Sequence, residues 1–397
     1  MDEFDALWAF LVAALIAFAA TPPVARLARR LGVIHRPRDR DLHDRPVPGL
    51  GGLAILAAAV VSALVFLPWN GETRGIVGGA LAIAFVGAVD DWREGGLNPG
   101  VKLAGQFAAG AILVASGVYV DHVTLPFVDP LGLGETGGKA LTLVGMVAVM
   151  NIVNFTDGAD GLAAGVCTIA AGTFAIIALS FDGRDDAGVL AALTAGAALG
   201  FLWHNFHPAS IFMGDAGSNL LGLLLAAVAI QGVLKTAAVV ALFFPLLILA
   251  VPALDATFVV AKRIKYGRPV YSADRWHFHH RFANIGFSQR RTVLYLYGWT
   301  LSLAALALAM RFVPYSEDDG TLNPGWALVI AGFGAIALAA SLYLVLQLEI
   351  LKFRRFRERE IQRQVETGEM PALTADQISR EVDREVETGE FEAVHTD

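Results

Sequence analysis

Four polar clusters stand out in an otherwise apolar chain, and each carries side chains that can bind a phosphate or a metal ion. In the first, Asp90 and Asp91 end an apolar run and Lys102 follows. Adjacent carboxylates repel each other and are costly beside hydrocarbon, so a metal ion, a lysine or a proton has to compensate them. A solvated loop would explain the Asp pair alone. The nearby lysine, which can neutralise a phosphate as a point charge, favours a functional site.

The second cluster places oxygen ligands at a regular interval. Its polar residues recur every three positions: Asn151, Asn154, Asp157 and Asp160. On a helix this spacing brings neighbours onto one face, and Gly158 and Gly161 permit a tight turn after it. Such ligands suit Mg²⁺, which prefers a few carboxylates and substrate phosphates to an all-protein cage. A turn rich in Asn and Asp would explain one or two of these residues, but not four.

The third cluster extends from Asn205 to Ser218 and holds Asp215 between two glycines, just before an apolar run. Glycines let backbone amides approach a phosphate, and the N-terminus of the helix that follows is an expected anion site. A helix cap would explain Asp215 alone. Its neighbours favour a metal ligand.

The fourth cluster, within residues 274–281, concentrates three histidines: His277, His279 and His280. Zinc binding would need further ligands, and no cysteine or Glu-x-x-His pattern completes a tetrahedral set here. Because arginines flank the histidines, we expect this segment to bind phosphate.

The composition predicts the elements that hold these clusters. Hydrophobic residues make up 55% of the chain and charged residues 17%, against about 25% charged in soluble domains. We therefore expect an all-α integral membrane protein with about eleven transmembrane helices. The predicted spans are 6–22, 49–68, 75–89, 101–119, 139–154, 161–181, 187–203, 217–234, 237–261, 292–313 and 325–347.

The loops between these spans differ in charge. One alternate set holds 17 Lys and Arg residues and the other holds 5, so the first set is predicted to be cytoplasmic, with the N-terminus outside and the C-terminus inside. All four polar clusters then lie on the cytoplasmic side. Residues 1–350 are predicted to form one catalytic membrane domain, and residues 351–397 a cytoplasmic basic helix with a mobile tail, in which Val365–Glu369 recurs as Val386–Glu390.

Taken together, the motifs resemble the polyprenyl-phosphate N-acetylhexosamine-1-phosphate transferase superfamily. The resemblance covers about residues 40–291 and rests on five motifs in order. They are His43–Pro48 with Gly51 and Gly52, the Asp pair with Pro99 and Lys102, Asn-x-x-Asn-x-x-Asp-Gly-x-Asp-Gly, Pro-Ala-x-x-Phe-Met-Gly-Asp-x-Gly-Ser, and the histidine segment. The form Asp-Arg-x-His-x-His-His is more similar to the branch that uses UDP-N-acetylglucosamine than to the branch that uses UDP-N-acetylmuramoyl-pentapeptide.

The resemblance implies a bacterial inner-membrane enzyme that transfers N-acetylglucosamine 1-phosphate from a UDP-sugar to undecaprenyl or another polyprenyl phosphate and releases UMP. Mg²⁺, with Mn²⁺ as an alternative, would be held by Asp215 with Asn154 or Asp157. The other implied roles are as follows: Asp90, Asp91 and Asp157 act in catalysis, Lys102, His277, His279 and His280 bind phosphates, Asp160 and Asn205 hold the uridine, and Asn151 binds substrate. A homodimer is left open.

Three other interpretations remain. The chain could be the phospho-N-acetylmuramoyl-pentapeptide transferase of the same superfamily. A secondary transporter would place its charged residues near the bilayer midplane and show repeated halves, whereas here the charges gather at one surface. A membrane scaffold would use the basic tail. No feature of the sequence points to a nucleic-acid partner.

Overall fold

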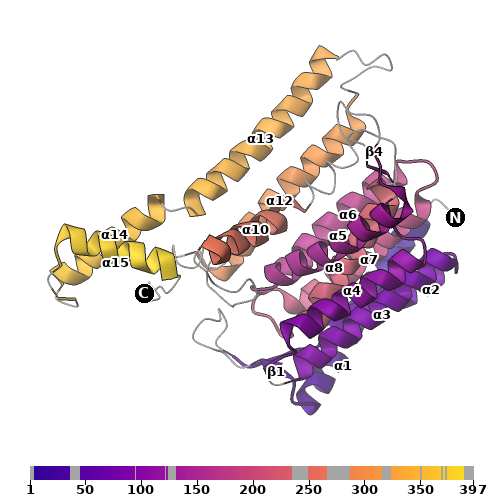
Figure 1. Cartoon of the computed structure of the whole chain (residues 1–397), viewed down its shortest axis with the longest axis horizontal. Coiled ribbons are helices and arrows are strands. Elements are labelled where there is room, and N and C mark those ends of the chain that lie inside the picture. The colour runs from indigo at the N-terminus through magenta and orange to yellow at the C-terminus, as the bar shows by residue number, and fades with distance from the viewer. Residues whose placement is uncertain are drawn as a thin grey trace.

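The computed structural model describes residues 4–35, 45–93, 95–120, 122–123, 131–234, 249–265, 287–314, 323–348, 351–367, 370–371 and 373–388. Long apolar helices run side by side as a bundle (Figure 1). The bundle's first eight helices are α1 (Asp5–Arg30), α2 (Gly52–Phe66), α3 (Gly71–Trp92), α4 (Pro99–Ala115), α5 (Gly134–Thr156), α6 (Leu162–Leu179), α7 (Asp185–Asn205) and α8 (Gly214–Ala229).

The later elements extend the bundle and end in a separate helical pair. They are the π-helix η1 (Ile230–Leu234), α10 (Ala250–Lys265), α12 (Gln289–Phe312), α13 (Pro324–Leu348), α14 (Leu351–Glu366) and α15 (Ala375–Thr388). Two short antiparallel ladders complete the described chain. In one, β1 (Ile34–His35) pairs with β2 (Val47–Pro48), and in the other β3 (His122–Val123) pairs with β4 (Leu131–Gly132).

The helices confirm the all-α membrane class. Each of the eleven predicted spans overlaps a described helix. Within the described residues, eight helical stretches are long and apolar enough to cross a membrane, and the shorter apolar helices there are α2, α4 and the first part of α10. The number of crossings, the orientation and the assembly state stay predictions.

Small residues let the helices approach closely. An added Cβ on Gly196 or Gly200 of α7 would lie 2.1 Å from the carbonyl oxygen of Phe10 or Ala14 on α1. Helices in lipid associate through close backbone packing, because burying apolar side chains there does not favour helix association. The pair α1 and α7 is thereby fixed without large side chains.

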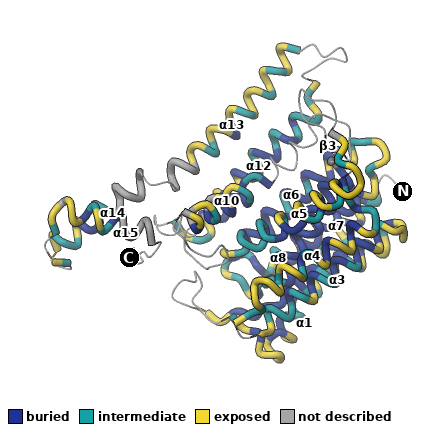
Figure 2. The backbone as a smooth tube through the Cα atoms, viewed as in Figure 1, coloured by how far each residue is buried: buried dark blue, intermediate teal, exposed yellow. Residues whose placement is uncertain are grey.

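Burial identifies the centre of the bundle. In α6, α7 and α8 most positions are buried, whereas α13 is largely exposed and stands apart from the other long helices (Figure 2). The helix α8, which carries Asp215, belongs to this buried centre.

The last two helices pack on each other around Ile361, Ile378 and Val382. Ile361 and Val382 each lie four residues before one copy of the repeated segment, Val365–Glu369 or Val386–Glu390. The predicted basic helix from residue 351 is present as α14, and the mobility of the tail stays a prediction.

Candidate active site at one end of the bundle

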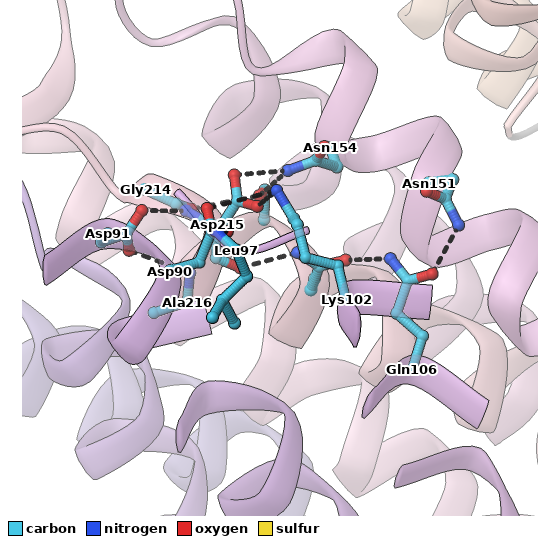
Figure 3. A network of polar contacts seen from close by, with 12 residues as sticks. Asp90, Asp91, Leu97, Lys102, Gln106, Asn151, Asn154, Gly214, Asp215 and Ala216 are labelled. Atoms are coloured by element: carbon cyan, nitrogen blue, oxygen red, sulfur yellow. Dashed lines mark hydrogen bonds and ion pairs between the residues drawn. The ribbon is translucent and has the colours of Figure 1, made fainter. Parts of the chain in front are cut away.

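Three of the four polar clusters meet at one end of the bundle. The C-terminal ends of α3 and α5 lie beside the N-terminal ends of α4 and α8, since the chain reverses direction between these helices. Figure 3 shows the side chains of these ends pointing toward one another. The convergence predicted from the spacing of the motifs and spans is thus present for the first three clusters.

The centre of the site is a group of three carboxylates with one lysine. Asp90, Asp91 and Asp215 each offer an oxygen, and these oxygens lie within 4.8 Å of one another. Lys102 forms ion pairs with Asp215 and, at 3.2 Å, with Asp90. Asp90 also accepts a hydrogen bond from the Leu97 amide at 2.6 Å. The oxygen donors carry more negative charge than one lysine balances, which suits a hard divalent cation such as Mg²⁺.

Asp91 holds the start of α8. Its two carboxylate oxygens accept hydrogen bonds from the backbone amides of Asp215, at 2.8 Å, and Ala216, at 3.2 Å. Two glycines allow this close approach: an added Cβ on Gly87 would lie 2.4 Å from Ala216, and one on Gly214 would lie 2.3 Å from Asp91. Gly214 also has a φ of +66°, which favours glycine. The expectation that this helix N-terminus binds phosphate is therefore wrong for these two amides. The anion they bind is the carboxylate of Asp91.

Asn154 joins the second cluster to the third. Its amide nitrogen donates to Asp215 Oδ1 at 3.0 Å and to Ser218 Oγ at 2.9 Å. The Asn154 side chain thus lies against the carboxylate group, where an amide oxygen could complete an oxygen ligand set.

A chain of amides supports the site from within the bundle. Asn151 donates to Gln106 Oε1 at 2.8 Å and to the carbonyl of Val147 at 2.8 Å. Gln106 donates to Asn219 at 2.7 Å, and Asn219 donates to the backbone carbonyl of Asp215 at 2.9 Å. The Asn151 amide nitrogen is therefore engaged by the protein itself. Its predicted contact with substrate stays a prediction.

Asp157 lies just beyond the end of α5, where the helix gives way to the loop 157–161. Burial raises the pKa of the Asp157 carboxyl well above its ordinary value, and the negative charges of Asp215, Asp91 and Asp160 raise this pKa further. A cation held here would reverse these effects, because it stabilises the ionised form.

Asp160 and Asn205 connect two loops of the site. Buried Asp160 accepts hydrogen bonds from His207 Nδ1 at 2.8 Å and from the Ala209 amide at 3.0 Å. Asn205 accepts one from the Gly161 amide at 3.1 Å. The regular three-residue spacing thus does not place Asp160 on the face shared by Asn151 and Asn154, because the helix ends before it.

Helix α12 contacts the loop 157–161 and the loop of His207. Tyr297 donates its hydroxyl to the Gly161 carbonyl at 2.6 Å and packs on Gly165, whose added Cβ would lie 1.9 Å from that hydroxyl. Arg290 donates to the His207 carbonyl at 3.1 Å. The helix that follows the histidine segment is thereby fastened to the loops of the second and third clusters.

The histidines of the fourth cluster, His277, His279 and His280, lie outside the described residues. Sequence reasoning missed three residues that the structure places in or against the site: Gln106, Asn219 and Tyr297. Gln106 had a usable signal, since a polar side chain inside a transmembrane helix is rare and commonly functional. Tyr297 had none, because its partner lies 136 residues away.

Comparison with known proteins identifies the family of the chain. A model of glycosyl transferase family 4 matches residues 73–233. The chain is 37% identical over 356 residues to the decaprenyl-phosphate N-acetylglucosaminephosphotransferase of Mycobacterium leprae, covering 82% of this chain and 88% of that protein. It is 37% identical over 306 residues to the probable undecaprenyl-phosphate N-acetylglucosaminyl 1-phosphate transferase of Bacillus subtilis, covering 76% and 84%.

A second group of relatives differs in name. The chain is 36% identical over 336 residues to the phospho-N-acetylmuramoyl-pentapeptide-transferase of Desulforudis audaxviator, covering 75% of this chain and 97% of that protein. The matched family region contains α4, α5 and α8 entirely and all the described carboxylates of the site. The chain is a multi-pass membrane protein that belongs to glycosyl transferase family 4, within the superfamily of polyprenyl-phosphate N-acetylhexosamine-1-phosphate transferases.

Proposed function

We propose that the protein transfers N-acetylglucosamine 1-phosphate from UDP-N-acetylglucosamine to a polyprenyl phosphate at the cytoplasmic face of the bacterial inner membrane. The observation that carries this proposal is the group of Asp90, Asp91, Asp215 and Lys102 at one end of an apolar helical bundle. A site at a helix end can meet a lipid phosphate and a soluble nucleotide together. The names of two relatives supply the sugar and the polyprenyl acceptor.

In this reaction an oxygen of the lipid phosphate attacks the phosphorus that bears the sugar. The bond from that phosphorus to the bridging oxygen breaks, UMP leaves with this oxygen, and the product is a lipid-linked sugar diphosphate. A phosphate monoester is largely ionised near neutral pH, because its second pKa is about 6. Catalysis therefore rests on position and charge rather than on a general base.

Mg²⁺ suits these oxygen ligands and would be held by Asp215 with Asn154 or Asp157, with Asp90 close to Asp215. When bound, the ion would supply neutralisation of the charge that develops on the diphosphate oxygens. Asp91 acts differently, since its oxygens hold the amides of Asp215 and Ala216. Its part is to keep Asp215 in place.

Lys102 positions a phosphate between the carboxylates. It lies between Asp90 and Asp215 and is partly exposed, so it can exchange one carboxylate for a phosphate oxygen. The histidines His277, His279 and His280 are proposed to bind the donor phosphates. Arg290 at the start of α12, nine residues after the last arginine of the histidine segment, donates to the His207 carbonyl, which supports this assignment.

The nucleotide is assigned to the neighbouring loops. Asp160 fixes the loop of His207 and Ala209, and Asn205 fixes Gly161. These loops would flank the uridine, beside the carboxylates that serve the diphosphate.

The test is UMP release by the purified protein with polyprenyl phosphate, Mg²⁺ and a panel of UDP-sugars that includes UDP-N-acetylmuramoyl-pentapeptide. We expect activity with UDP-N-acetylglucosamine and none with the pentapeptide donor. Asp215→Ala should abolish it, and Asp182→Asn, an exposed carboxylate in the loop before α7, should not change it. Activity with the pentapeptide donor alone would instead assign the reaction of the phospho-N-acetylmuramoyl-pentapeptide-transferases. Full activity in Asp215→Ala would refute the site.

A further inference from the structure

A groove outside the carboxylate site runs between α12 and α13. It encloses about 360 Å³, within the range of about 300–1,000 Å³ that is usual for ligand pockets. Its walls are almost wholly apolar and include Leu294, Trp299 and Ala340. Trp299 Nε1 donates to Ser341 Oγ at 2.8 Å, which fastens the two helices together beside the groove.

The groove faces the surroundings of the bundle. α13 stands apart from the other long helices and packs mainly on α12 (Figure 1), and both helices are long and apolar enough to span a membrane. At Gly298 an added Cβ would meet nothing within 4 Å, so the wall is open there. In a bilayer, an open apolar groove of this kind takes a hydrocarbon chain.

One end of the groove carries a positive charge. Arg291 lines it and lies exposed in the first turn of α12. An arginine there is disfavoured by the helix dipole, whereas an anion is favoured by the dipole and by the guanidinium. The adjacent Arg290 is turned toward the His207 carbonyl, at 3.1 Å. Arg291 therefore marks the groove end nearest the site, at the level where lipid headgroups would lie.

We propose that this groove binds one anionic glycerophospholipid of the bilayer, with its headgroup phosphate on Arg291 and one acyl chain along Gly298. Tyr295 and Tyr343 also line the groove, and tyrosine is favoured near headgroups. The polyprenyl substrate is the less suitable occupant, because none of the carboxylates of the site lies on α12 or α13. The proposal depends on the two helices spanning a membrane and not on the reaction.

The test is native mass spectrometry of the full purified chain, titrated with phosphatidylglycerol or phosphatidylethanolamine. We expect one phosphatidylglycerol per chain, bound more tightly than phosphatidylethanolamine. Arg291→Gln should weaken this binding about tenfold, the order expected for one charge-assisted hydrogen bond. Gly298→Leu should abolish it by filling the groove. Arg30→Gln, an exposed arginine at the end of α1, should leave it unchanged.

Gly298→Leu should fold normally, since its side chain meets open space, and an unchanged melting temperature without added lipid checks this. Binding that treats both lipids alike and ignores Arg291→Gln would overturn the proposal. The proposal would also be overturned if Gly298→Leu still bound phosphatidylglycerol but had a raised KM for polyprenyl phosphate. That result would assign the groove to the substrate's polyprenyl chain. Conversion of a dimer to a monomer by Gly298→Leu, with lipid binding intact, would assign it to a second copy.

Discussion

Asp91 accepts a hydrogen bond from the backbone amide of Asp215, so one carboxylate of the site holds the helix that presents another. Two like charges are brought together by this arrangement, and the α8 amides offset part of the repulsion. The relationship separates the two neighbouring aspartates of α3. Asp90 contacts Lys102, whereas Asp91 contacts the backbone of α8.

Asp91→Ala should therefore lower both stability and activity. The amides of Asp215 and Ala216 lose their acceptor, which costs about 1 kcal/mol, as for other lost helix caps. The displacement of Asp215 should reduce kcat at least 100-fold. Thermal unfolding and UMP release measure the two effects. Asp91→Asn is the matched control, since its amide oxygen can still accept one of the two α8 amides, and equal melting temperatures in the Ala and Asn variants would count against the capping role.

Lys102→Met should leave Asp90 and Asp215 without their ammonium partner. We expect kcat/KM to fall at least 100-fold, because a positioned charge on the reacting phosphates is lost. The metal-free protein should lose about 1–2 kcal/mol, a value reduced from that of a fully buried pair because Lys102 is partly exposed. Unfolding with and without Mg²⁺ checks this, since Mg²⁺ should restore part of the stability. Lys102→Arg, which keeps the charge, should retain most of the metal-free stability.

The sequence was sufficient to predict that the site forms where helix ends meet. Spans of about 20 residues put Asp90, Asn154 and Asp215 at the same side of the bundle, because alternate spans reverse direction. The adjacent carboxylates also predicted a compensating metal ion, lysine or proton, and the structure places Lys102 against Asp90. Both inferences depend on local spacing and on the cost of charge near hydrocarbon.

The rest depends on contacts between distant segments. The sequence suggested a cation or a proton for Asp91, but the partners are two amides more than 120 positions away. Spacing placed Asp160 on a helix face, but the helix ends at Thr156, and Asp160 turns to His207. Neither outcome follows from periodicity, because the first depends on how α3 packs on α8 and the second on a contact between the loops that follow α5 and α7.

The raised pKa of Asp157 predicts a pH-dependent stability in the metal-free protein. In the unfolded state the Asp157 carboxyl loses its proton near the ordinary pKa of about 3.9, whereas the folded state keeps the proton up to its raised pKa. The free energy of unfolding therefore falls as the pH rises between these two pKa values. Asp157→Asn removes this loss. We expect its melting temperature in chelator to exceed that of the wild type at pH 8, with a smaller gap at pH 5. A gap that does not change with pH would show that the carboxyl titrates normally.

Tyr297→Phe tests whether α12 positions the site. The variant keeps the ring against Gly165 and loses the hydrogen bond to the Gly161 carbonyl, which should cost about 1 kcal/mol. Because Gly161 also donates to Asn205, the loop of Asp160 should loosen, and we expect a several-fold rise in KM for the UDP-sugar with a smaller change in kcat. Steady-state UMP release measures both. Tyr119→Phe, at the opposite end of the bundle, is the control, and a Tyr297→Phe enzyme with reduced stability but unchanged KM would limit α12 to a structural role.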